Sequence, residues 1–93
     1  MKIHWSSHFI KQVKKAVKHE PALATKIENT VDLLAKNPFN PRLNTHKLKG
    51  FLEESWSCSV DYYNRIIFDF ISNSETQENE ILLLSFGTHD EVY

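Results

Sequence analysis

Residues 56–71 read WSCSVDYYNRIIFDFI, and this stretch decides the fold class of the chain. Apolar side chains alternate with small or charged ones over residues 56–62, and the alternation resumes over residues 65–71 after Tyr63-Asn64. A period of two residues is typical of strands that bury one face, and Tyr63-Asn64 offers a turn between two such strands. The stretch therefore predicts two consecutive strands of one sheet.

The flanking segments extend this sheet. Residues 72–79 are polar and acidic without an apolar side chain, which predicts a hairpin connection. The apolar run Ile81–Leu84 follows, and we expect a strand buried on both faces that ends at Gly87. Near the N-terminus, Ile3 and Trp5 alternate with polar residues and predict a further strand at the edge or centre of the sheet.

Two helical patterns separate the N-terminal strand from the rest. Ser6-Ser7 offer an N-cap, and apolar residues then recur every three or four positions up to Val17. A second helical pattern starts at Pro21 and stops at Asn37-Pro38, and residues 38–50 predict an exposed basic loop. The predicted order is β-α-α-β-β-β, an α+β fold in a single domain that spans residues 1–93.

Composition excludes several classes of protein. The single cysteine, Cys58, excludes a disulfide framework and a cysteine-built zinc or iron–sulfur site within one chain. The two glycines are too few for a dinucleotide or phosphate loop. The longest apolar run is much shorter than the about 20 residues that a helix needs to cross a bilayer. The N-terminal residues do not have the pattern of a signal peptide. We expect a cytoplasmic protein without a membrane span, a metal or a small-molecule cofactor.

Charge is unevenly distributed along the chain. Residues 1–50 hold ten Lys or Arg against three acids, whereas residues 51–93 hold one Arg against nine acids. A chain with this uneven charge distribution can present a basic face to a polyanion although its net charge is −1. A solvated surface that serves solubility is the alternative explanation. The basic residues that we expect to face a polyanion are Lys11, Lys14, Lys15, Lys18, Arg42, Lys47 and Lys49.

Two of the five histidines are candidates for chemistry. His46 and His89 lie in predicted loops at the ends of strands, and imidazole titrates near neutral pH, as a general acid or base requires. Arg65 and neighbouring lysines can surround a phosphate. Three tyrosines offer faces on which bases can stack, namely Tyr62, Tyr63 and Tyr93.

Three segments carry a resemblance to a known family. They are residues 46–50 (HKLKG), residues 65–68 (RIIF) and residues 87–93 (GTHDEVY). With the order of elements, they resemble the RelE/ParE superfamily of bacterial type II toxins and, within it, the YafQ-like branch. This resemblance implies a RelE-like fold, in which a small twisted, mainly antiparallel sheet packs against two N-terminal helices.

The resemblance also implies a function. Relatives are metal-independent endoribonucleases, or mRNA interferases, that cut mRNA in the ribosomal A site, and a cognate antitoxin protein neutralises them. By the same resemblance, His46 and His89 match catalytic histidines, and Arg65 matches the arginine at the scissile phosphate. Tyr93 matches the terminal aromatic residue of the site.

The chain departs from the family pattern in two places. Many relatives carry a second arginine where this chain has Ser85-Phe86. YafQ-like members have a histidine and an aspartate in the first hairpin, where this chain has Val60, Asp61 and Asn64. Two alternatives to an RNA-cutting enzyme therefore stay open: a ParE-like toxin that inhibits gyrase, and a catalytically weak member that acts by binding partners.

Overall fold

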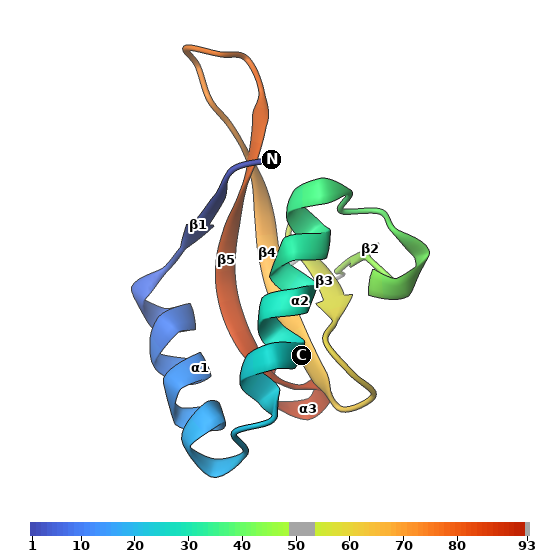
Figure 1. Ribbon diagram of the computed structural model, residues 1–93. Helices are drawn as coiled ribbons and strands as arrows, with labels where there is room; N and C mark the ends of the chain where they lie inside the picture. Colours follow the sequence, from blue (N-terminus) through green and yellow to red (C-terminus); the bar gives the residue numbers. More distant parts are fainter. Residues whose placement is uncertain (49–53, 93) are drawn as a thin grey trace.

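The computed structural model describes residues 1–48 and 54–92 and is shown in Figure 1. A five-stranded sheet has the order β1-β5-β4-β3-β2. β1 pairs parallel with β5, and the other neighbours are antiparallel. The elements, in chain order, are β1 (Ile3–Trp5), α1 (Ser7–His19), α2 (Leu23–Lys36), the 3-10 helix η1 (Pro41–Leu43), β2 (His46–Lys47), β3 (Trp56–Ser59), β4 (Asn64–Ser72), β5 (Asn79–Thr88) and α3 (His89–Val92).

The predicted α+β fold is confirmed, and the N-terminal strand is an edge strand. The β4–β5 hairpin is the longest part of the sheet and projects beyond the helices (Figure 1). In this ladder a bulge between Ile67 and Phe68 shifts the register. Such a bulge increases the local twist of a sheet.

Local capping sets the limits of both helices. The Ser6 hydroxyl accepts a hydrogen bond from the Phe9 backbone N–H, so α1 begins with the predicted N-cap. The predicted C-cap, Asn37, donates its N–H to the Leu33 carbonyl at the end of α2. α2 begins at Leu23 rather than at Pro21, because Pro21 and Ala22 form a turn that bridges the two helices.

One hydrophobic core lies between the helices and one face of the sheet. The cysteine at its centre is fully buried, and burial raises the pKa of the Cys58 thiol to about 12. That thiol is therefore protonated and unreactive at neutral pH. The buried apolar residues of this core are Phe9, Leu23, Ile27, Val31, Leu34, Leu43, Cys58, Ile66, Phe68, Ile81, Leu83 and Phe86.

The strand register assigns functional residues to the opposite face of the sheet. Paired residues on neighbouring strands share a face, and Arg65 is paired with Ser59 and with Gly87. Two residues along β3, Ser57 is paired with His46. Arg65 and His46 therefore both lie on the face that points away from Ile66, Cys58 and the helices.

Four sequence-based expectations need correction. Residues 38–50 do not form one irregular loop, because η1 and β2 lie within its described part. Strand β3 ends at Ser59 because a turn starts at Val60. Ile81–Leu84 is not buried on both faces, since Leu82 and Leu84 are half-buried. Strand β5 continues past Gly87 to Thr88, where its last residue pairs with Asn64.

Candidate active site

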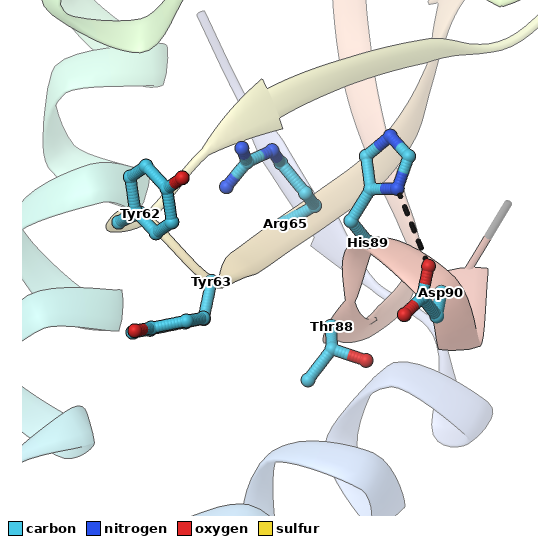
Figure 2. A pocket seen from close by; sticks show the side chains of 6 residues that line it. All are labelled: Tyr62, Tyr63, Arg65, Thr88, His89 and Asp90. Carbon is cyan, nitrogen blue, oxygen red and sulfur yellow. Dashed lines mark ion pairs between the residues drawn. The ribbon is translucent and has the colours of Figure 1, made fainter.

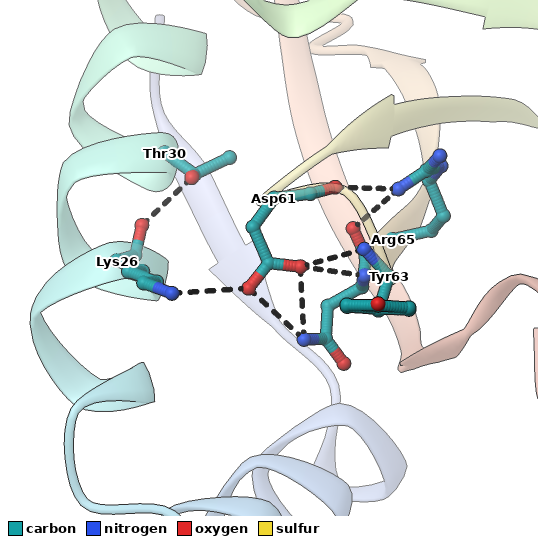
Figure 3. A network of polar contacts seen from close by, with 6 residues as sticks. Lys26, Thr30, Asp61, Tyr63 and Arg65 are labelled. Carbon is teal, nitrogen blue, oxygen red and sulfur yellow. Dashed lines mark hydrogen bonds and ion pairs between the residues drawn. The ribbon is translucent and has the colours of Figure 1, made fainter.

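A single carboxylate organises the turn between β3 and β4 (Figure 3). Oδ1 of Asp61 accepts hydrogen bonds from the backbone N–H of Tyr63 (2.9 Å) and of Asn64 (2.8 Å). The Asn64 side chain donates to both carboxylate oxygens, and Nζ of Lys26 on α2 lies 3.4 Å from Oδ2. An aspartate that caps its own turn in this way fixes the backbone of the following residues.

These contacts shift the titration of Asp61. Burial by itself raises the pKa of this carboxyl group. The backbone N–H groups of Asn64 and Tyr63 stabilise the charged form, as do the side chains of Asn64 and Lys26. Together they outweigh burial and hold the pKa of Asp61 below its ordinary value. The turn is therefore built around a carboxylate that is ionised at neutral pH.

The same turn anchors Arg65. Nη1 of its guanidinium donates to the carbonyl oxygens of Asp61 (2.6 Å) and Asn64 (3.0 Å), as Figure 3 shows. Within the described part of the chain, Arg65 forms no salt bridge with Asp61 or Asp69. Within that part, Nε and Nη2 of Arg65 donate no hydrogen bond, so these nitrogens are available to an anion.

His89 follows the end of the neighbouring strand β5, two residues after the Gly87 that pairs with Arg65. It is the first residue of the short helix α3 rather than a loop residue, and its N–H donates to the Tyr63 carbonyl oxygen over 3.2 Å. Its Nδ1 lies 3.7 Å from the Asp90 carboxylate. The contact with Tyr63 ties the chain after β5 to the β3–β4 turn, which holds the imidazole next to the guanidinium.

An exposed pocket of about 320 Å³ contains these groups. Figure 2 shows Arg65 between Tyr62 and His89, with Tyr63 and Thr88 below them. A cation and an imidazole beside aromatic rings are suited to a phosphate that is linked to a base. The residues that line the pocket are Tyr62, Tyr63, Arg65, Thr88, His89 and Asp90.

His46 shares the outer face of the sheet but does not line this pocket. It is exposed on β2, a two-residue edge strand rather than a loop, because it pairs with Ser57 of β3. Its Nδ1 donates to the Asn44 carbonyl oxygen (3.0 Å). Since a carbonyl can only accept, the neutral ring carries its proton on Nδ1, and Nε2 is the acceptor nitrogen.

Comparison with known proteins decides the family. The sequence profile of a family described as "Bacterial toxin of type II toxin-antitoxin system, YafQ" matches residues 1–93. The chain belongs to the YafQ toxin family. The resemblance found in the sequence is thereby confirmed over the whole chain. No curated protein sequence matches this YafQ-family toxin.

Solved structures confirm the fold. YafQ from Escherichia coli BL21(DE3) superposes with a TM-score of 0.78 at 21% identity, covering 99% of this chain and 97% of that chain. YafQ in the E. coli DinJ-YafQ complex superposes with a TM-score of 0.77 at 20% identity, covering 99% of this chain and 97% of that chain. A YoeB/ParE toxin from Agrobacterium tumefaciens superposes with a TM-score of 0.77 at 17% identity, covering 96% of this chain and 99% of that chain. This YafQ-family toxin therefore has the fold of the RelE/ParE superfamily.

The expected basic residues that the structure describes fall into two groups. α1 packs on β5, whereas η1 packs on α2 and β3, so β4 separates the two groups. One lysine of α1, Lys15, reaches a groove that contains Asn64 and Gly87, next to the pocket. Of the basic residues expected to face a polyanion, those that the structure describes are all exposed, namely Lys11, Lys14, Lys15 and Lys18 on α1, Arg42 on η1 and Lys47 on β2. Two expected site residues, Lys49 and Tyr93, lie outside the described residues.

Sequence reasoning missed the residue that builds the site. In the sequence, Asp61 stands out only as a departure from the family pattern, yet it organises the turn that carries Arg65. The signal was present, because aspartate three residues before asparagine is typical of the first position of a turn. Residues 1–48 and 54–92 contain no group of three or more His, Cys, Asp or Glu placed to hold a metal. None of the helices they form is long and apolar enough to cross a bilayer.

Proposed function

We propose that this YafQ-family toxin is a metal-independent endoribonuclease that cuts mRNA on the ribosome at the pocket of Arg65 and His89. One observation carries the proposal: the turn and the strand end bring a guanidinium and an imidazole together in an exposed pocket beside two aromatic rings. A gyrase inhibitor needs no such acid–base group. RNA cleavage uses each of these groups.

The reaction moves two protons. The ribose 2′-OH loses its proton to a base as its oxygen attacks phosphorus, and the bond from phosphorus to the 5′-oxygen breaks as that oxygen receives a proton. We assign the acid to His89, which lies in the pocket. We assign the base to His46, which lies on the same face of the sheet as Arg65 although it does not line the pocket itself. The products are a 2′,3′-cyclic phosphate and a 5′-OH.

Arg65 stabilises the charge that develops on the phosphate. Two carbonyl oxygens hold one edge of its guanidinium through Nη1, so the charge is fixed before substrate arrives. Preorganised donors of this kind stabilise a transition state without a cost of reorganisation during the reaction. By the family resemblance, Tyr93 is a further candidate for contact with a base.

Two classes of partner follow from the proposal. The exposed lysines of α1, with Arg42, Lys47 and Lys49, contact phosphates of mRNA and ribosomal RNA. A cognate antitoxin neutralises the toxin, as membership of a toxin-antitoxin family implies. The similar structure of the E. coli DinJ-YafQ complex supports a protein partner for this fold.

The test measures RNA cleavage by translating ribosomes. His89→Ala should lower the cleavage rate about 10²- to 10⁴-fold, since one positioned acid or base contributes about that factor. His8→Ala serves as the matched control, because His8 is exposed at the start of α1, away from the pocket. Growth arrest with DNA damage and intact transcripts would instead establish gyrase inhibition.

A second measurement addresses the assignment of the two histidines. If His46 and His89 both transfer protons, the wild-type rate plotted against pH is bell-shaped with two ionisations. His46→Ala should remove one limb of this profile and His89→Ala the other. A profile that keeps both limbs in a folded His46→Ala variant would remove His46 from the mechanism.

A further inference from the structure

Two adjacent tyrosines next to the pocket are unusually exposed. Tyr62 is 84% exposed and Tyr63 is 69% exposed, although buried aromatic rings are a large source of stability. Their turn does not require them, since turns favour small or polar residues such as Asp61 and Asn64. A pair of aromatic rings in water, beside a cationic pocket, is typical of a binding surface.

The backbone that carries these rings is fixed on both sides. Tyr63 donates its N–H to Asp61 and accepts a hydrogen bond at its carbonyl oxygen from the N–H of His89. The ring centroids of Tyr62 and Tyr63 lie 5.0 Å apart with an angle of 82° between the planes. The rings are therefore held in an edge-to-face pair on a braced turn, and both line the pocket with Arg65.

We propose that Tyr62 and Tyr63 form a nucleobase-stacking site that holds the two bases flanking the scissile phosphate in a splayed conformation. This inference rests on the proposed function and specifies its substrate as unstacked, single-stranded RNA. Successive stacked bases are parallel, so rings at 82° cannot both stack on two bases of one continuous stack. Each ring takes one base, and the strand opens at the phosphate between them.

The neighbouring groups favour RNA over a protein as the occupant. Arg65 lines the same pocket as both rings, which combines a phosphate contact with base stacking. An opened linkage also suits the reaction, because the 2′-oxygen must approach phosphorus in line with the departing 5′-oxygen. The aromatic pair thus acts in specificity and positioning, whereas His89 acts in proton transfer.

The experiment measures the affinity of single-stranded RNA oligonucleotides in which a 2′-deoxynucleotide blocks cleavage. Tyr63→Ala and Tyr62→Ala should each weaken binding about 5- to 150-fold, the range for the loss of one stacked base. Tyr63→Phe and Tyr62→Phe are matched controls that keep the ring and should bind within about twofold of wild type. His8→Ala, at an exposed position of α1 that does not line the pocket, should bind this RNA as the wild type does.

A paired change in the RNA shows whether stacking is the cause. An abasic nucleotide on one side of the blocked linkage should weaken wild-type binding and remove the difference between wild type and one alanine variant. Unchanged affinity in both alanine variants, or no RNA binding by the wild type, would overturn the stacking site. Loss of antitoxin binding alone would assign the rings to the protein partner.

These outcomes are separable from failure of the proposed function. If the alanine variants bind and cut RNA normally while His89→Ala is inactive, the stacking site is wrong and the endoribonuclease stands. If the wild type binds RNA through the two rings but no variant or wild type cuts it, the stacking site stands and the enzymatic proposal is wrong.

Discussion

At the scale of single residues, Asp61 has the widest influence on the candidate site. Its carboxylate holds the backbone of Tyr63 and Asn64, and its carbonyl oxygen holds Arg65. It is a positioning residue, since it acts through the tyrosines and the arginine rather than on substrate. Two predictions follow from its contacts.

Asp61→Ala removes the acceptor from the turn. We expect a loss of about 1–3 kcal/mol in the free energy of unfolding, because backbone donors lose a charged partner. Chemical denaturation measures the change. Lys26→Met, which removes only the half-exposed ion pair, is the control and should cost less than about 1 kcal/mol. Equal losses in both variants would mean that the ion pair, not the capped turn, provides the stability.

The stabilising contribution of Asp61 should depend on pH. Because the folded pKa lies below the ordinary value of 3.8, the folded protein binds fewer protons than the unfolded chain in that range. The contribution is complete above pH 3.8 and is lost as pH falls through the folded pKa. Urea unfolding at several pH values should show the gap between wild type and Asp61→Asn closing in acid. A gap that is constant with pH would contradict this.

At the scale of elements, α1 carries a basic stripe whose nearest approach to the pocket is Lys15. That side chain lines a groove of about 280 Å³ with Asn64 and Gly87, the neighbours of Arg65 and Thr88 along the two strands. If RNA binds in the pocket as proposed, a strand that leaves it on this side would meet α1 at Lys15.

Lys15→Glu should therefore weaken RNA binding and flatten its dependence on salt. Each lost phosphate contact lowers the slope of log affinity against log salt by about 0.7 for a single strand. Lys36→Glu is a matched control with the same charge change on an exposed lysine at the end of α2. The test is a salt titration of RNA affinity, and an equal slope for both variants would assign the stripe to solubility.

At the scale of the whole molecule, one hydrophobic cluster joins both helices to the sheet. The catalytic candidates lie on the outer face, whereas the residues that hold the strands in register lie beneath them. Arg65 and Ile67 alternate with the buried Ile66, so the position of the site depends on the packing of the core.

Leu34→Ala should show this dependence. The side chain is fully buried under the sheet, and its truncation should cost about 2–5 kcal/mol. Unfolding followed by tryptophan fluorescence and by circular dichroism should shift together, as expected of a single core. Ile10→Ala, at a position that is 36% exposed, is the milder comparison and should cost less. Separate transitions would show that helices and sheet unfold independently.

Most of the elements could be predicted from the sequence because they depend on local patterns. Short segments of sequence are enough to recognise the two-residue period of β4, the helical spacing of α1 and the N-cap at Ser6. The sequence-based prediction of secondary structure was wrong where an element forms only by pairing with a segment that is distant in the sequence. β2 exists only because His46 and Lys47 pair with β3, and two residues carry no periodicity of their own.

The sequence by itself determined the α+β class, the family and the identity of the candidate groups, because periodicity and motif spacing are properties of the chain. Only the tertiary structure decided which groups meet. Arg65 and His89 are 24 positions apart in sequence, yet pairing of β4 with β5 places them in one pocket. His46 stays outside that pocket, because β4 and β3 lie between β5 and its own strand, β2. Register and bridging hydrogen bonds are long-range, so no local pattern encodes them.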